Sequence, residues 1–375
     1  MDVAPSKDGH PRTAPFRHPG ILVDAERLEF VKAKIALGAD PWKSALAAAA
    51  ESRFASSTYT PRPVAVVRCG PHSHPDEGCS AEKNDAIAAY TNALLWALTG
   101  TPAFAQKAIE IMNAWSATLE RHEGSNAPLQ AAWVASIVPR AAEIVRATGA
   151  PWATADVQRF SAMLKTGYLP EVSGGAPRQN GNWELSMIEA AMAIAVFLDD
   201  AATFDRAVAM WRARVPAYFY LKADGALPLP PPGGVHESAA EIEAFWFKPQ
   251  VFVDGMSQET CRDLGHAQYG LAAAVHAAET ARIQGVDLFA EQAPRIEAAL
   301  EFHARWLAGE AVPHWLCDGH LAEVQPAPTW EIAYSAYAGR MGIALPRTRA
   351  LLARIRPTGA DHAMDWETLT HADGG

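Results

Sequence analysis

Four side chains able to take part in acid–base chemistry follow one another in QETCRDLGHAQYGLAAAVHAAET, residues 258–280. They are Glu259, Arg262, His266 and Tyr269, spaced three, four and three residues apart. The segment contains no proline, so we expect a helix over 256–282 that carries all four on one stripe. A guanidinium near a phenol lowers the pKa of the phenol, which makes Tyr269 a candidate general base. A structural network of ion pairs accounts equally well for the spacing.

A second polar group precedes the apolar segment RQNGNWELSMIEAAMAIAVFLDD, residues 178–200. Asn180, Gly181 and Asn182 form a turn signal, and an N-cap is the simplest explanation for one asparagine. The same run places two neutral amides beside Trp183. Because amide donors next to an aromatic face suit a carboxylate-bearing sugar, Asn180, Asn182 and Trp183 are candidate binding residues.

Other candidate binding residues lie on neighbouring segments. Gln130 and Trp133 are three residues apart, so they can share an inner helix face that lines a groove. Asn84 stands on an expected helix and is a further candidate for substrate binding. His236, in GGVHES, lies in a long loop that can reach a cleft, although a solvated loop histidine explains it equally well.

Two loops with histidine raise the question of a metal site. PHSHPDEGC (71–79) and HWLCDGH (314–320) both lack the paired spacing of a common zinc site, so we expect polar loops, no metal and no cofactor. Cys69 and Cys79 either pair or remain free thiols. SGGAPRQNG lacks a Walker lysine and follows no strand, which argues against a phosphate loop, and no G-x-S-x-G elbow is present.

The composition is that of an ordinary globular protein. The chain has 375 residues, 49% of them hydrophobic and 20% charged, and a formal net charge of −10. This charge argues against a nucleic-acid partner, which a basic stripe would favour. We find no apolar run long enough to span a bilayer and no signal peptide at Met1, so we expect no membrane partner.

Helical periodicity dominates the chain, and strand signals are limited to RPVAVV (62–67) and PQVFV (249–253). Two long loops rich in proline and glycine cover 54–80 and 222–255. About twelve helices in consecutive pairs, with no composition shift, predict a single all-α toroid domain over 1–375, with 1–17 as a flexible segment. The expected helices are 24–37, 41–53, 82–99, 102–120, 127–148, 153–166, 181–199, 202–219, 256–282, 286–308, 328–342 and 346–354.

At this level of detail the sequence resembles a known group of enzymes. HPGILVDAERLEFVKAKI, NDAIAAYTNALLWALTGTPAFAQKAIEIMNAWS, NGNWELSMIEAAMAIAVFLDD and QETCRDLGHAQYGLAAAVHAAETARIQG resemble the alginate-lyase-like superfamily of polysaccharide lyases, and within it the glucuronan (cellouronate) lyases of polysaccharide lyase family thirty-eight. The likeness runs from His18 to IRPTG. The spacing of Arg262 and Tyr269 is similar to the catalytic Arg–Tyr pair of bacterial alginate lyases. The Asn-Asn-His run of those enzymes is replaced here by the residues at 180–183, so a neutralising histidine has to be His236 or His266.

The resemblance implies a complete or incomplete (α/α) toroid of six or seven helical hairpins that cleaves a β-1,4-linked uronan by syn β-elimination. In that mechanism Asn182 and a histidine offset the charge of the uronate carboxylate, and Tyr269 removes the neighbouring proton and then protonates the leaving oxygen. Arg262 either keeps Tyr269 partly ionised or binds the carboxylate. We expect glucuronan as substrate, with mannuronan-rich alginate second, because the two sugars differ only at carbon two.

Two other classes compete with a lyase. A glycoside hydrolase on the same toroid needs a pair of carboxylates, which Asp85, Glu184, Glu237 or Glu259 can supply. A non-catalytic glycan-binding toroid needs only the tryptophan platforms. The sequence does not fix the oligomeric state, and a periplasmic or secreted location is inferred from the size of a polysaccharide substrate alone.

Overall fold

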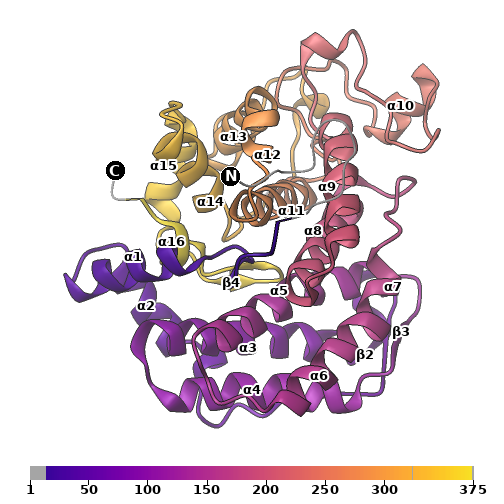
Figure 1. Cartoon of the computed structure of the whole chain (residues 1–375). Coiled ribbons are helices and arrows are strands. Elements are labelled where there is room, and N and C mark those ends of the chain that lie inside the picture. Colours follow the sequence, from indigo (N-terminus) through magenta and orange to yellow (C-terminus); the bar gives the residue numbers. More distant parts are fainter. Residues whose placement is uncertain (1–13, 323, 374–375) are drawn as a thin grey trace.

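A computed structural model describes residues 14–322 and 324–373 of the protein. The expected all-α toroid is confirmed, because helices arranged in successive hairpins make up most of the described chain (Figure 1). The strands are short, with two to four residues each. Residues 1–13, most of the segment expected to be flexible, lie outside the described residues. The remaining part of that segment is held, since the Phe16 ring packs edge-on against Phe204 with 5.4 Å between centroids.

Four long helices form the inner row of the toroid. Each packs against the next, and nearly every residue between their first and last turns is buried. Their abundant alanines allow this close contact, because small side chains let helix backbones approach on more than one face. These helices are α3 (Cys79–Thr99), α5 (Ala127–Ala147), α8 (Gly181–Leu198) and α11 (Leu264–Ile283).

The outer helices bury one face only. In α13, for example, Ile296, Leu300 and His303 recur at helical spacing on the buried side. The order of packing is α3 with α4, α4 with α6, α8 with α9, and α13 with α15. The outer helices are α4 (Pro102–Thr118), α6 (Thr154–Met163), α9 (Ala201–Arg214), α13 (Ala293–Leu307) and α15 (Pro346–Ile355).

The first and last described helices pack together. Helix α16 (Glu367–His371) packs on α1 (Ala25–Ala36), α2 (Trp42–Glu51) and α14 (Glu331–Tyr334). Just before α16, strands β4 (Ala360–Asp361) and β5 (Met364–Asp365) form a hairpin. In Figure 1 this hairpin lies between α16 and α8, beside α11, so it brings the C-terminal segment to the middle of the fold.

The remaining elements are short. Strands β1 (Val66–Cys69), β2 (Asp76–Glu77) and β3 (Arg121–Glu123) form a sheet of order β2-β1-β3, with β1 antiparallel to β2 and parallel to β3. The short helices are α7 (Leu169–Val172), α10 (Ala239–Phe245) and α12 (Leu288–Glu291), and π-helical turns cover Leu164–Tyr168 and Ser335–Arg340.

Three expected elements outside the candidate site differ clearly from the structure. The helix over 286–308 is divided into α12 and α13, because Gln292 leaves the helical conformation just before the proline that starts α13. The helix over 328–342 begins only at Glu331 and continues as a π-helical turn. The expected strand PQVFV (249–253) is wrong, since no strand in the described part of the chain pairs with it.

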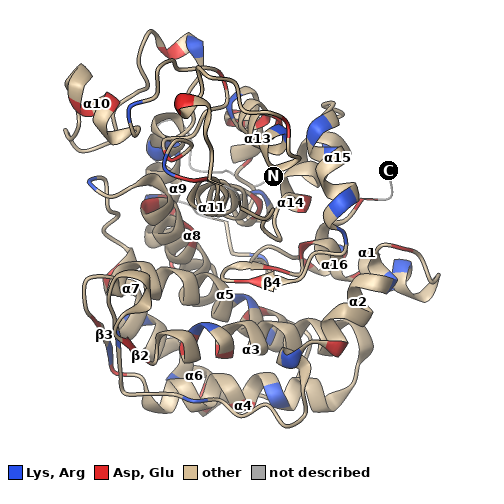
Figure 2. Ribbon diagram, turned by 180° about the vertical axis from the view of Figure 1, so that it is seen from behind, with Lys and Arg blue, Asp and Glu red and all other residues tan. Residues whose placement is uncertain are grey.

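The prediction that no apolar run is long enough to span a bilayer is wrong for helix α8. It is long and apolar enough to do so, but 89% of it is buried inside the fold, as in the core helix of a toroid. Acidic and basic residues alternate over the helices in Figure 2, without a large area of one charge on the side shown. The net charge is therefore spread over the elements in that view.

Candidate active site

A buried carboxylate joins the two inner helices that carry the predicted site. Glu259 is fully buried and accepts hydrogen bonds from the backbone N–H and the side-chain Nδ2 of Asn182, the latter at 2.7 and 2.8 Å. It also accepts from Arg262 Nη1 at 2.7 Å and from Tyr218 Oη at 3.1 Å. Glu259 therefore positions Asn182 and Arg262, and it occupies the amide donors that Asn182 was expected to offer to a substrate.

The glycine of the Asn-Gly-Asn turn is required by this arrangement. A Cβ at Gly181 would lie 2.0 Å from the Tyr218 ring, and a Cβ at Gly270 on α11 would lie 2.2 Å from Tyr218 Oη. Tyr218 thus packs between α8 and α11, and both glycines are needed to leave space for its ring. The Gly181 N–H donates to Gln258 Oε1 at 2.9 Å, and Gln258 Nε2 donates to Asn180 Oδ1 at 3.1 Å. Asn180 is therefore a partner of the turn that carries Glu259.

The expected helix over 256–282 begins only at Leu264, so the four-residue stripe is wrong in its first half. Asp263 is the N-cap, and its Oδ1 accepts from the backbone N–H of His266 at 2.8 Å. Glu259 and Arg262 precede this cap in a turn. Arg262 is thereby directed to Glu259 instead of lying two turns before Tyr269 on the same helix.

Tyr269 lines a small cavity between α5, α8, α11 and the β4–β5 hairpin. Its ring centroid lies 6.3 Å from that of Trp133 on α5 and 5.2 Å from that of His362 in the hairpin. Ser186 of α8 lines the same cavity and stands one helical turn after Asn182. Asn182 itself does not line the cavity, so it supports the wall that Tyr269 faces.

The pKa of Tyr269 is raised to about 12, whereas the sequence predicted a lowered value. Burial is the main cause, and the charges of Asp361 and Asp263 add to it. Arg262 does not counteract them, because its guanidinium is bound to Glu259. The phenol is therefore protonated at neutral pH in this structure.

The floor of the cavity is a buried ionic network. His276 lies on α11 two turns after Tyr269 and donates to Glu189 at 3.0 Å and to Glu367 at 2.7 Å. Arg140 of α5 also donates to Glu189. Burial disfavours the imidazolium, but the two carboxylates outweigh it and raise the pKa of His276 to about 9. These groups fix α5, α8 and α11 beneath Tyr269.

The two histidines proposed from the sequence occupy different places. The His266 ring centroid lies 6.1 Å from that of Tyr269, and its Nδ1–H donates to Asp263 Oδ2 at 2.7 Å. His236 instead stacks on Phe245, with centroids 4.3 Å apart and planes 13° from parallel. No contact between His236 and Tyr269 occurs in the described part of the chain, so only His266 lies beside the phenol.

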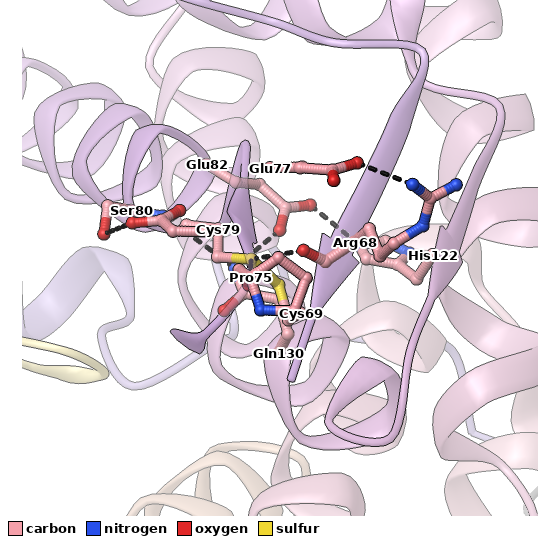
Figure 3. The surroundings of a disulfide bond; sticks show 10 residues. Arg68, Cys69, Pro75, Glu77, Cys79, Ser80, Glu82, His122 and Gln130 are labelled. Atoms are coloured by element: carbon pink, nitrogen blue, oxygen red, sulfur yellow. Dashed lines mark hydrogen bonds and ion pairs between the residues drawn. A yellow bond between two sulfur atoms is a disulfide. The ribbon is translucent and has the colours of Figure 1, made fainter. Parts of the chain in front are cut away.

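Gln130 is turned away from the cavity. Its Nε2 donates to Glu82 Oε2 at 2.7 Å and to the Cys79 carbonyl at 3.0 Å, and Glu82 also accepts from His122 (Figure 3). Gln130 therefore belongs to a buried polar cluster beside the Cys69–Cys79 disulfide. Its partner in the sequence prediction, Trp133, does reach the cavity.

The other predicted binding residues, Asn84 and Trp183, do not line the cavity of Tyr269. Asn84 accepts a hydrogen bond from Arg53 at 2.7 Å, at the edge of α3. Trp183 is half-buried in the first turn of α8. Their roles in binding a substrate stay predictions.

Most of the carboxylates that a hydrolase would need are bound to other side chains of the fold. Asp85 accepts from Tyr59 and Trp115 at 2.7 Å each, and Glu184 is buried 3.3 Å from Arg214. Glu259 is held as described above. Three of the four carboxylates therefore serve the fold, and only Glu237 is exposed.

Sequence reasoning missed His362, the residue nearest to Tyr269 among the aromatic contacts. The ring of His362 also meets Trp133 edge-on, with 4.9 Å between centroids. The only signal was a polar run, ADHAMD, beyond the end of the family likeness. A short hairpin without glycine or asparagine gives no turn signal, so this histidine could not be placed from the sequence.

All four cysteines are paired. Cys69–Cys79 closes the first loop, and Cys261–Cys317 ties the turn before α11 to the loop after α13. The first pair settles the alternative left open by the sequence. Among the described residues, no group of three or more histidine, cysteine or acidic side chains could hold a metal ion.

Solved structures with the same fold cover almost the whole chain. Alginate lyase A1-III from Sphingomonas species A1 is 17% identical, with a TM-score of 0.63, and the match covers 96% of this chain and 98% of that one. A tyrosine-to-phenylalanine variant of alginate lyase A1-III, complexed with a tetrasaccharide, gives 17% identity, a TM-score of 0.64 and coverages of 97% and 99%. An alginate lyase from Bacteroides ovatus is 16% identical, with a TM-score of 0.56 and coverages of 95% and 99%.

No curated protein sequence matches the chain. The alginate lyase family matches residues 33–230, just over half of the chain, including Trp133 and Asn182. The matched part ends before Tyr269, whose place in the site comes from the structure. The protein belongs to the alginate lyase family and is a polysaccharide lyase.

Proposed function

We propose that the protein cleaves a β-1,4-linked uronan by syn β-elimination, with Tyr269 as the base and then the acid. The observation that carries this proposal is the position of Tyr269 in a cavity walled by Trp133 and His362. Trp133 offers an aromatic face for a sugar ring, and Tyr269 is the phenol next to it. A relative crystallised with a tetrasaccharide carries a tyrosine-to-phenylalanine substitution, which agrees with a catalytic tyrosine in this fold.

The elimination needs only one residue to move a proton. Tyr269 reacts as its phenolate: Oη takes the proton from carbon five of the uronate, the bond from carbon four to the bridging oxygen breaks, and a double bond forms between carbons four and five. The same Oη then returns the proton to the departing oxygen. The carbanion formed is stabilised only if the charge of the uronate carboxylate is offset, which requires donors in the cavity.

The proposed substrate is glucuronan, on the sequence likeness, with polymannuronate as the second candidate. Membership of the alginate lyase family and the names of the structural neighbours favour the second. Both sugars place the proton and the leaving oxygen on the same face of the ring, so one tyrosine serves either. We also propose a periplasmic or secreted location, supported by two disulfides, which persist in oxidising compartments.

The test is the ultraviolet absorbance of the unsaturated product, measured with glucuronan, polymannuronate, polyguluronate and hyaluronan. Tyr269→Phe should abolish the absorbance on every substrate and leave the circular dichroism and the melting temperature close to those of the native protein. Phe at 269 keeps the contact with Trp133, so lost activity reports the missing hydroxyl. Full activity in this variant would refute Tyr269 as the base, and reducing ends without absorbance would indicate hydrolysis.

A further inference from the structure

The β4–β5 hairpin delivers a histidine to the cavity from a remote part of the chain. His362 lies at the turn of this hairpin, with a positive φ of 52°. Its ring touches Trp133 and Tyr269, which belong to α5 and α11. A non-glycine residue in the left-handed region is uncommon and needs support from its surroundings. Arg140 supplies part of it by donating to the carbonyl of the next residue, Ala363, at 2.9 Å.

The imidazole of His362 is also oriented. Its Nδ1–H donates to Asp361 Oδ1 at 2.6 Å, since a carboxylate can only accept. This bond fixes the ring and leaves Nε2 as the second polar atom. No hydrogen bond to Nε2 is made by the residues that the structure describes, and the side chain is 25% exposed, so Nε2 is available to a ligand in the cavity.

The other predicted donors do not line this cavity. The amide of Asn182 and the guanidinium of Arg262 are bound to Glu259, and His266 is tied to Asp263 outside the cavity wall. Lys83 lies 5.0 Å from the centroid of the Trp133 ring and is a second positive group at the edge. Because Asp361 and Asp263 already place negative charge near Tyr269, a uronate carboxylate needs a donor here.

We infer that His362 is a substrate-contacting residue of this lyase: in its imidazolium form Nδ1–H donates to Asp361, which positions the ring, and Nε2–H donates to the carboxylate of the uronate whose proton Tyr269 removes. This inference rests on the proposed function and assigns the donor that the mechanism requires. The proton path is unchanged, since the proton still moves from carbon five to Tyr269 and then to the leaving oxygen. His362 only stabilises the negative charge that builds up on the carboxylate.

The experiment compares two replacements at 362 on the best substrate of the absorbance screen. His362→Phe keeps an aromatic ring against Trp133 and Tyr269 but removes both nitrogens, whereas His362→Gln loses the ring and keeps an N–H donor. We expect kcat/KM to fall about 100-fold or more in His362→Phe, as for the loss of one stabilising donor, and less in His362→Gln. His320→Ala, an exposed loop histidine, is the matched control and should keep native activity.

The outcomes separate this inference from the proposed function. If the native protein yields unsaturated product and His362→Phe is as active, the inference is overturned while the lyase assignment stands. If both variants lose activity equally and keep native melting temperatures, the ring packing and the donor are both needed. A third variant, His362→Ala, then tests the donor alone, because added imidazole should restore its activity. Failure of imidazole to restore activity overturns the inference. If the native protein forms no unsaturated product from any uronan, the proposed function itself fails.

Discussion

The ionisation of Tyr269 gives the sharpest quantitative test of the proposed chemistry. Burial and two nearby acids raise its pKa to about 12, compared with an ordinary value of 10.0. Two pKa units correspond to about 3 kcal/mol, or about a 100-fold smaller phenolate fraction at neutral pH. Because kcat/KM reports ionisations of the free enzyme, it should rise by up to about tenfold per pH unit on the alkaline side of neutrality.

Two aspartate variants separate the charge of the surroundings from the role of His362. Asp263→Asn removes one of the two negative charges but keeps the N-cap, since asparagine caps a helix as well as aspartate. The pKa of Tyr269 should fall, and kcat/KM at neutral pH should rise severalfold. The rise stays far below 100-fold because burial is the main cause of the shift and because a less basic phenolate is a weaker base.

Asp361→Asn also removes a negative charge near Tyr269 but weakens the bond that orients His362. The two variants should therefore change activity in opposite directions. The assay is the pH dependence of product absorbance, together with an ultraviolet titration of tyrosinate in which Tyr269→Phe serves as the reference. A plateau of kcat/KM from about pH 8 upward, with a matching tyrosinate titration, would contradict the raised pKa of the free enzyme. A rise in both variants would remove the positioning role of Asp361.

Three further predictions concern the elements that hold the site. Glu259→Gln should lower the free energy of unfolding by about 1.5–3 kcal/mol in urea denaturation, because it removes the buried charge that accepts from Arg262, whose own side chain is 28% exposed; an unchanged value would show that the turn does not depend on the charge. The raised pKa of His276 contributes on the order of 3 kcal/mol to the free energy of unfolding; this contribution is complete below pH 6.5 and is lost as the pH rises through about 9. In His276→Gln, the free energy of unfolding measured across this pH range should therefore show no such decrease. Replacing Cys261 and Cys317 by alanine opens a loop of 56 residues and should lower the free energy of unfolding by about 4 kcal/mol in the same urea measurement. Replacing Cys69 and Cys79 opens a loop of only 10 residues and should lower it by less, so a larger loss for this second pair would contradict the chain-entropy estimate.

The long inner helices could be predicted because their sequences favour a helix throughout. The segments around α3, α5 and α8 are apolar, rich in alanine and bounded by glycine, asparagine or proline, so their ends were placed within a few residues. The errors arose where one polar residue decides a boundary. Asp287 caps a short helix that breaks soon afterwards, and Asp263 starts α11 eight residues later than expected.

The sequence placed candidate residues on helices, but it did not give their partners. Trp133 and Tyr269 were both expected on helices, and the structure places their ring centroids 6.3 Å apart, whereas their roles stay predictions. Gln130 stands one turn before Trp133, yet it faces Glu82 in another cluster. Which buried carboxylate takes up a donor depends on contacts between helices, and one sequence contains no record of such contacts.

The cap at Asp263 connects these observations. The sequence prediction placed Arg262 two turns before Tyr269 on a continuous helix, where its charge was expected to make the phenol more acidic. Since the helix starts at Asp263, Arg262 belongs to the preceding turn and neutralises Glu259, while Asp263 itself adds negative charge near the phenol. The error in the expected start of α11 therefore reversed the sign of the expected shift in the pKa of Tyr269. The positive group that the reaction requires must then reach Tyr269 from another part of the chain, and the C-terminal hairpin carries the one imidazole that contacts both Tyr269 and Trp133 in the described structure.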